Sequence, residues 1–179
     1  EITNAGMMDC KKALLEADGD FENAKVLLRE KGQSKADSKS GRTTAQGIAL
    51  IKVEADNSVI LEVNCETDFA AKDNLFHQFV NSIAKLILEN NIDNMDQLNQ
   101  QSFDEFENIE EYRKFIISKL GENITIRRFQ RIKIDGQIGS YIHGTKIASL
   151  VEIDNRNTYA GDDAELAKDV AMHVAASKP

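Results

Sequence analysis

The apolar residues of this chain change from strand-like clusters to a helical spacing and back, and this change limits the folds that the chain can adopt. Residues 48–66 place Val, Ile and Leu on both sides of the polar pair Asp56–Asn57, which predicts a strand, a hairpin turn and a second strand. From about Phe69 the spacing becomes helical. The apolar residues that carry this spacing are Phe76, Phe79, Val80, Ile83, Leu86 and Ile87.

The second half of the chain repeats this change between helix and strand. Residues 89–111 hold many acidic side chains and no Lys or Arg, which indicates a solvated helical surface. Tyr112–Leu120 continues a helix that Gly121 can end. Residues 124–153 have the Ile and Val content and the glycine turns of a three-stranded antiparallel meander. Residues 162–177 then predict an amphipathic helix with an apolar side formed by Leu166, Val170, His173 and Val174.

The first part of the chain predicts two short helices. Asp20 is the expected N-cap of the second helix, and Gly32 is its expected stop. The expected apolar sides are Met7, Cys10, Leu14 and Ala17 in the first helix, and Phe21, Ala24, Leu27 and Leu28 in the second. Two helices of this length cannot bury a core alone, so the pair needs a further helix or another surface to pack on.

Composition predicts where the chain divides. Residues 33–44, QSKADSKSGRTT, contain almost no large apolar side chain, which is typical of a solvated linker. We therefore predict a helical module at residues 1–32, a linker at residues 33–44 and a core domain at residues 45–179. Pro179 is the one proline, so no proline interrupts the helices before it. The predicted fold class is α+β, with antiparallel strands packed against helices.

Charge and residue usage argue against several classes of function. The net charge of −8 disfavours direct binding of nucleic acid, which depends on Lys and Arg side chains that neutralise phosphates. We interpret the basic run Arg127, Arg128, Arg131 and Lys133 as the solvated face of a strand. No segment resembles a signal peptide or a membrane span. The two cysteines lack the spacing of a zinc or redox site, so we expect no metal, no cofactor and a cytoplasmic location.

No catalytic motif supports an enzyme. The chain has no phosphate-binding loop, zinc-protease motif or nucleophile elbow, so no catalytic residue is assigned. A thiol enzyme stays as an alternative, with Cys65 near Asp68 and with His143 or His173 as the base. The simpler interpretation makes Cys65 a buried strand residue and His173 a core histidine. A turn between strands is expected to present His143 outward.

Residues 64–72, with the sequence NCETDFAAK, are not explained by packing alone. They lie where a strand ends and a helix begins, so Thr67 or Asp68 can cap that helix. Capping does not explain a large aromatic side chain directly afterwards. Two interpretations stay open: Phe69 inserts into a partner, or it packs into the core.

Five segments of the chain follow one another in the order of a known family. They are residues 4–32, VNCETDFAAKD, KLGENITIRR, GSYIHG and AMHVAASKP. In these segments the chain resembles the bacterial elongation factor Ts family. The resemblance implies a guanine-nucleotide exchange factor for translation elongation. Such a protein binds elongation factor Tu in its GDP-bound and nucleotide-free forms, disturbs the magnesium site of that protein and promotes GDP release.

The resemblance also assigns residues. Thr67, Asp68, Phe69 and Ala70 match a tetrad that dislocates magnesium from elongation factor Tu, and Asp68 and Phe69 are expected to intrude beside the metal. The family's fourth residue is Val, so Ala70 is a departure that should cost some apolar contact. The further expected partner contacts are Met7, Met8, Leu120, Gly121 and His143.

The resemblance implies a ubiquitin-associated-like (UBA-like) N-terminal module whose first helix precedes Glu1. After the segment that matches AMHVAASKP, long members of the family continue into a second core subdomain and a coiled-coil dimerisation hairpin, whereas short members end nearby. A homodimer is therefore left open. A passive scaffold, which binds a protein without changing its nucleotide affinity, is the second alternative to an exchange factor.

Overall fold

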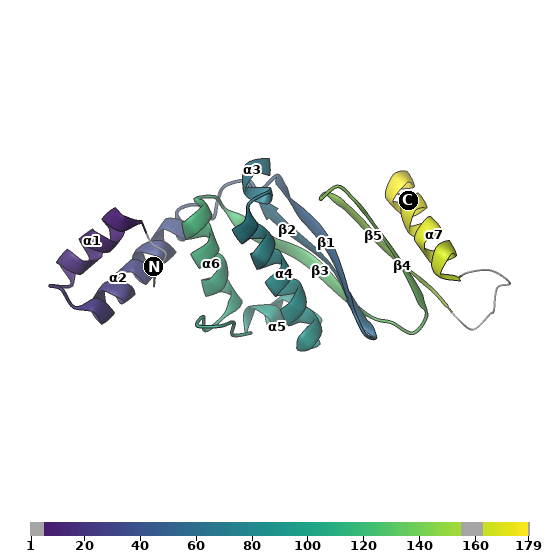
Figure 1. Cartoon of the computed structure of the whole chain (residues 1–179), viewed down its shortest axis with the longest axis horizontal. Coiled ribbons are helices and arrows are strands. Elements are labelled where there is room, and N and C mark those ends of the chain that lie inside the picture. The colour runs from purple at the N-terminus through teal and green to yellow at the C-terminus, as the bar shows by residue number, and fades with distance from the viewer. Residues whose placement is uncertain (1–5, 155–162, 179) are drawn as a thin grey trace.

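The computed structural model describes residues 6–154 and 163–178 of the chain. Figure 1 shows an elongated molecule with a helical pair at one end, a helix-covered sheet in the middle and a hairpin with one helix at the other end. The elements in chain order are α1 (Met7–Glu16), α2 (Phe21–Asp37), β1 (Gln46–Glu54), β2 (Asn57–Cys65), α3 (Asp68–Ala71), α4 (Asn74–Glu89), α5 (Met95–Asn99), α6 (Ile109–Leu120), β3 (Ile124–Lys133), β4 (Gln137–His143), β5 (Ile147–Ile153) and α7 (Asp163–Ser177). This mixture of helices and antiparallel strands confirms the α+β class.

The central sheet is antiparallel and has the order β1-β2-β3. The β1–β2 hairpin is confirmed, with Glu54 paired to Asn57 across its turn. Ala55 in that turn has a φ of 51°, so the backbone reverses through a left-handed residue. The alternate residues Val59, Leu61 and Val63 of β2 are buried, so one face of the sheet turns inward.

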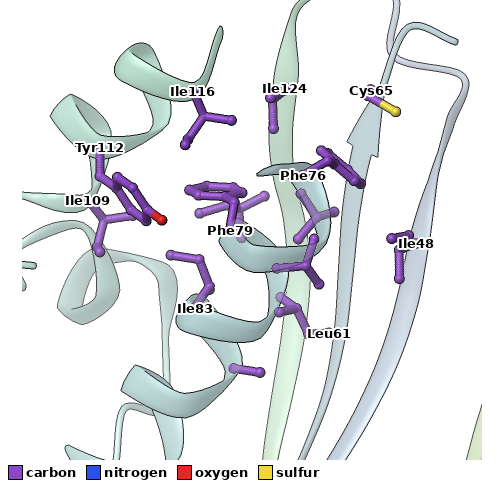
Figure 2. Packing of buried hydrophobic residues seen from close by; sticks show 14 of the residues in the cluster. Ile48, Leu61, Cys65, Phe76, Phe79, Ile83, Ile109, Tyr112, Ile116 and Ile124 are labelled. Atoms are coloured by element: carbon purple, nitrogen blue, oxygen red, sulfur yellow. The ribbon is translucent and has the colours of Figure 1, made fainter. Parts of the chain in front are cut away.

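Helix α4 covers that inner face, as its helical spacing predicted. Phe76 and Phe79 are completely buried, and Phe79 lies next to Tyr112 of α6 with ring centroids 5.1 Å apart. Figure 2 shows Phe79 between the helices and Phe76 close to the sheet. The core of this domain is therefore one layer of helices on one layer of sheet.

The predicted three-stranded meander is wrong. Strand β3 pairs with β2, whereas β4 and β5 form a separate two-stranded sheet. Glu152 explains part of the break between β3 and β4, because its carboxylate accepts the backbone N–H groups of Asp135 and Gly136, at 2.6 and 2.7 Å. The chain therefore leaves the central sheet at the Asp135–Gly136 turn.

The predicted apolar side of the last helix is also wrong. Helix α7 packs on β4 and β5 through Ala167, Ala171 and Ala175, whereas Leu166 and Val170 are exposed. Small side chains let the helix approach the strands closely. The hydroxyl of the buried Ser149 in β5 donates a hydrogen bond of 2.5 Å to the carbonyl oxygen of Ala171. The close contact excludes large residues from this face.

The first two helices differ from expectation as well. The Asp20 cap is confirmed, since its carboxylate accepts the N–H groups of Glu22 and Asn23. Gly32 does not end α2, which continues to Asp37. Gly32 instead faces α6, where a Cβ at this position would lie 3.6 Å from the hydroxyl oxygen of Ser118. Of the eight residues expected on apolar sides, Met7, Leu14 and Phe21 are exposed.

The acidic stretch at residues 89–111 is mostly loop rather than the expected helical surface. It contains the five-residue helix α5, and Leu98 of that helix is buried. Phe103 and Phe106 exchange two backbone hydrogen bonds in a tight turn. The expected end of α6 is confirmed, since Gly121 has a φ of 76° and its N–H bonds the carbonyl oxygen of Ile117.

Two further expectations concern the chain as a whole. Among residues 6–154 and 163–178, no helix combines the length and apolar character needed to cross a lipid bilayer. The division into a module, a linker and a core domain stays a prediction, although α2 extends into the segment expected to be linker. The first helix expected of a UBA-like module lies outside the described residues.

Gly139→Ala should loosen α7. A Cβ at Gly139 would lie 2.0 Å from the backbone carbon of Ala167, so the helix must shift. We expect a loss of about 1–3 kcal/mol in the free energy of unfolding, as for other overpacked sites. Urea unfolding followed by circular dichroism measures it. Gly41→Ala is the matched control, because nothing lies within 4 Å of its Cβ position. Equal unfolding midpoints for both variants would contradict this packing.

Candidate functional site

Phe69 stands on a short helix at the end of β2 and is 81% exposed. Thr67 caps this helix, α3, by accepting the N–H of Ala70 at 3.2 Å. Ala70 and Ala71 are buried, so the inner side of α3 rests on the core. The side chain of Phe69 therefore does not pack into the core of the chain, and its insertion into a partner stays a prediction.

Asp68 is exposed beside Phe69, and its carboxylate lies 3.2 Å from the ammonium group of Lys72 on the next turn. An exposed pair of this kind contributes little to stability. The end of β2 thus presents a carboxylate and a phenyl ring to solvent, while Ala70 anchors the helix that carries them. We call Asp68 and Phe69 the wedge.

Leu120 and Gly121 lie beside the wedge, as β3 pairs with β2 at this end of the sheet. Cys65, the last residue of β2, is opposite Ile124, the first residue of β3. The turn before β3 therefore runs next to the segment that leads into α3. Leu120 is half-buried against the core, and Gly121 is exposed. The structure thus brings the tetrad and the Leu120–Gly121 pair together.

His143 lies at the tip of the β4–β5 hairpin and is exposed, as expected. Its Nδ1 atom is 3.0 Å from the hydroxyl of Tyr141. The tip contacts β1, because the N–H of Ala49 donates to the carbonyl oxygen of Thr145 at 2.7 Å. Lys146 also bonds the side chain of Gln46, which pairs with the last residue of β2. Figure 1 shows this tip and α3 at the same end of the central sheet.

Met7 and Met8 form a separate exposed site on α1, where they are 87% and 63% exposed. Helix α1 packs on α2, and α2 packs on α6, so the methionines are carried away from the wedge. The ion pair between Lys35 and Asp9, at 3.2 Å, ties α1 to α2. Three further apolar residues of the helical pair are exposed, namely Leu15, Val26 and Phe21. The sequence did not single out Leu15 or Val26, and it placed Phe21 on a buried side.

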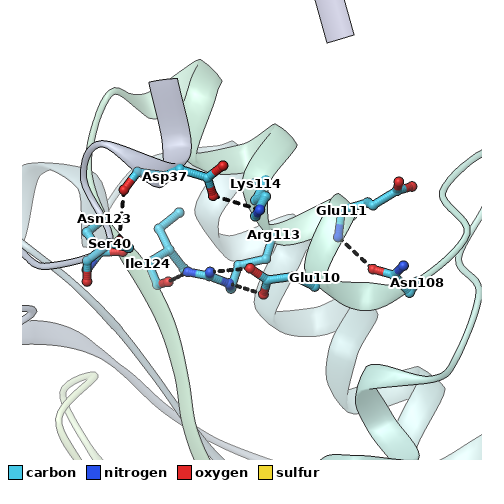
Figure 3. Close-up of polar contacts among 9 residues, drawn as sticks. All are labelled: Asp37, Ser40, Asn108, Glu110, Glu111, Arg113, Lys114, Asn123 and Ile124. Carbon is cyan, nitrogen blue, oxygen red and sulfur yellow. Dashed lines mark hydrogen bonds and ion pairs between the residues drawn. The ribbon is translucent and has the colours of Figure 1, made fainter. Parts of the chain in front are cut away.

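The joint between α2 and the core domain is held by polar contacts. The ammonium group of Lys114 on α6 lies 2.6 Å from the carboxylate of Asp37, the last residue of α2. Figure 3 shows this pair together with the contact between Asn123 and Ser40. The helical pair is therefore fastened at the same turn that lies beside the wedge.

Carboxylates offset part of the charge of the basic run on β3. Glu62 lies 3.6 Å from Arg127 and 2.7 Å from Arg128. A bulge in the β2–β3 pairing places both arginines near this one carboxylate. Arg131 pairs with Asp93 at 2.7 Å. Three of the four basic side chains of the run therefore have an acidic side chain beside them.

The residues of a thiol site are not assembled. Cys65 is completely buried, and its thiol donates to the carbonyl oxygen of Thr67 at 3.2 Å. Burial, together with the nearby negative charge of Glu122, raises the pKa of this thiol to about 11. His173 is exposed and lies 3.3 Å from Ser177, so the prediction of a core histidine is wrong. In the part of the chain that the structure describes, no cluster of His, Cys, Asp and Glu suits a metal ion.

The model of the family described as "Elongation factor TS" matches residues 66–179. Over its whole length the chain is 46% identical to elongation factor Ts of Methylococcus capsulatus and 45% identical to that of Legionella pneumophila. It is also 45% identical to elongation factor Ts of Nitrosospira multiformis. The chain spans about 60% of the length of these relatives. The match includes the wedge, the Leu120–Gly121 turn and His143, and the chain therefore belongs to the elongation factor Ts family.

Proposed function

We propose that the chain is a guanine-nucleotide exchange factor that binds elongation factor Tu with bound GDP and promotes GDP release during translation elongation. The observation that carries the proposal is the exposed phenyl ring of Phe69 beside the Asp68 carboxylate. An isolated exposed phenyl ring has an unfavourable hydration free energy, and its burial in a partner contributes about 1.5–3 kcal/mol. Membership of the elongation factor Ts family supports the same role.

Exchange of this kind needs binding rather than chemistry on the protein itself. The wedge enters beside the magnesium ion of elongation factor Tu and weakens the metal's hold on the GDP phosphates. By linkage, a factor that weakens GDP binding is itself bound less well when GDP is present. No bond is made or broken by this chain, so it is not an enzyme in this mechanism.

The remaining sites define how the partner is held. Met7 and Met8 are proposed to dock on one surface of elongation factor Tu, since methionine side chains adapt to irregular surfaces. The wedge, Leu120, Gly121 and His143 contact a second surface near the nucleotide. Two contacts, one on the helical pair and one at the edge of the central sheet, would hold the partner in one orientation. A homodimer stays a prediction, and so does a cytoplasmic location.

Replacement of both wedge residues tests the proposal. Asp68→Ala combined with Phe69→Ala should lower the maximal rate of mantGDP release from elongation factor Tu by at least about tenfold, which corresponds to about 1.4 kcal/mol. Folding should be unaffected, as both side chains are exposed. Stopped-flow fluorescence measures the release. Val53→Ala is the matched control, because Val53 is an exposed apolar residue near the other end of the central sheet.

Three outcomes would contradict the proposal. In the first, the parent chain does not accelerate release. In the second, the wedge variant is as fast as the parent. In the third, elongation factor Tu binds the chain equally well with and without GDP, which would favour a passive scaffold.

Met7→Ala combined with Met8→Ala should separate docking from exchange. These side chains lie far from the wedge, so the maximal release rate should stay near that of the parent. The concentration of chain needed for half of that rate should rise by at least about tenfold, because apolar contact area is lost. A titration of chain in the mantGDP assay measures both quantities. A fall in the maximal rate alone would contradict a docking role.

Alkylation distinguishes an exchange factor from a thiol enzyme. Iodoacetamide reacts with thiolates, and the raised pKa keeps Cys65 protonated near neutral pH. We expect peptide mass spectrometry to find Cys65 unlabelled in the folded chain and labelled in urea, with exchange unchanged by the treatment. Rapid labelling of Cys65 with loss of activity would support the thiol alternative.

The raised pKa of Cys65 also predicts how stability depends on pH. The folded state favours the protonated thiol, so the free energy of unfolding should fall as pH rises from about 9 towards about 11.

A further inference from the structure

The turn after α6 and the segment before α3 hold each other through two glutamate side chains. The Glu122 carboxylate accepts the N–H of Thr67 at 2.9 Å and the hydroxyl of Thr67 at 2.6 Å. In return, the Glu66 carboxylate accepts the N–H of Asn123 at 2.6 Å. The contacts are reciprocal, because each segment supplies one carboxylate and receives the other. We call these four residues the bracket.

The bracket determines which way the cap of α3 faces. A threonine hydroxyl has one hydrogen, and Thr67 donates it to Glu122. A lone pair of the same oxygen is then directed towards the N–H of Ala70, at 3.2 Å. The carbonyl oxygen of Thr67 also accepts the N–H of Ala71, at 3.2 Å. Glu122 therefore orients Thr67, whose hydroxyl and carbonyl oxygens accept the first two hydrogen bonds of α3.

Helix α3 has only four residues, so it depends on such contacts. A helix of one turn has little stability of its own, because the cost of nucleation is spread over very few hydrogen bonds. Its inner side is fixed by the buried Ala70 and Ala71. Its outer side carries Phe69, which is exposed to solvent and held by no packing of its own. The direction of this ring is thus set by the backbone of α3.

Glu122 is itself held in place on both sides. Asn123 is 3% exposed, and its side-chain amide donates to the carbonyl oxygens of Ser40 and Arg42 at 3.2 and 2.8 Å. Figure 3 shows Asn123 next to Ser40 at the start of β3. Gly121 precedes Glu122 in the left-handed conformation that ends α6. A carboxylate between two such anchored residues has little freedom to move away from Thr67.

We propose that Glu122 is a positioning residue for the wedge: its carboxylate locks the Thr67 cap and thereby fixes the direction in which Phe69 and Asp68 project. The proposal rests on the exchange function proposed above. Hydrogen bonds to an ionised carboxylate are shorter and stronger than those between neutral groups, which suits a lock on a four-residue helix. Glu122 need not touch the partner for this role.

The first experiment measures the direction lock without any partner. The chain contains no tryptophan, so Phe69→Trp introduces a single tryptophan at the wedge, which is excited selectively at wavelengths that tyrosine does not absorb. In this background, Glu122→Ala should lower the fluorescence anisotropy of Trp and raise its quenching by acrylamide. Glu122→Gln should give an intermediate result, because its amide oxygen still accepts the N–H of Thr67 but no carboxylate receives the hydroxyl hydrogen.

Matched controls separate local positioning from general loss of stability. Glu62→Ala removes a half-buried carboxylate on β2 that pairs with Arg128 rather than with Thr67. It should leave the anisotropy of the reporter unchanged. Thr67→Val keeps the shape of the side chain without the hydroxyl and should match Glu122→Ala, whereas Thr67→Ser keeps the hydroxyl and should match the parent.

The second experiment measures release of mantGDP from elongation factor Tu with Phe69 in place. Glu122→Ala should lower the maximal release rate by about tenfold, with Glu122→Gln between it and the parent. The chain concentration that gives half of the maximal rate should change less, because Met7 and Met8 are untouched. This split is not expected of a variant that is merely less stable.

The proposal is overturned if Glu122→Ala leaves the mobility of the reporter unchanged, or if Glu62→Ala mobilises it equally. It is also overturned if the reporter becomes mobile and the release rate stays at the parent value. A parent chain that does not accelerate release would instead overturn the proposed function. In that case the reporter alone still decides whether Glu122 holds α3, so the two failures are distinguishable.

Discussion

Burial of α4 against the inner face of the central sheet is the interaction on which the rest of the structure depends. Phe76 and Phe79 are completely buried between that sheet and α6, and Figure 2 shows the aromatic and aliphatic side chains that surround them. This packing fixes the end of β2 against the start of β3. The elements proposed to contact the partner near its nucleotide, namely α3, the turn after α6 and the tip of the β4–β5 hairpin, are placed relative to that edge.

The edge where β2 ends and β3 begins also supports α3, the short helix that is proposed to act on the partner. Two buried alanines seat α3 on the core, and the Glu122 carboxylate orients its cap, so the exposed ring of Phe69 is carried on a fixed base. A flexible ring would lose conformational freedom on insertion, which reduces the free energy available for displacing the nucleotide. The Asn123 contacts fasten the helical pair to the same turn. The proposed docking residues and the wedge are thus connected through one turn.

The strong patterns in the sequence predicted the core, and the weaker ones did not. The hairpin around Asp56–Asn57 and the helix at residues 74–89 follow from apolar spacing, because a buried face needs a regular row of large side chains. The prediction of a three-stranded meander was wrong because the apolar patterns of the three strands are alike and do not say which strands pair. In the structure β3 pairs with β2, and β4 pairs with β5. The prediction that Leu166 and Val170 are buried was wrong for a related reason. Helix α7 packs through its alanines, and the hydrophobicity of a residue does not show how closely a helix approaches a sheet.

The sequence by itself determined the α+β class, the two central strands, the long helix and the segment that carries Asp68 and Phe69, since these depend on local spacing and composition. Only the tertiary structure decided that Phe69 is exposed and that Cys65 is buried, because exposure depends on what packs against a residue. The same is true of Glu122. Its partner is 55 residues away in the sequence, and only strand pairing between β2 and β3 brings the two side by side.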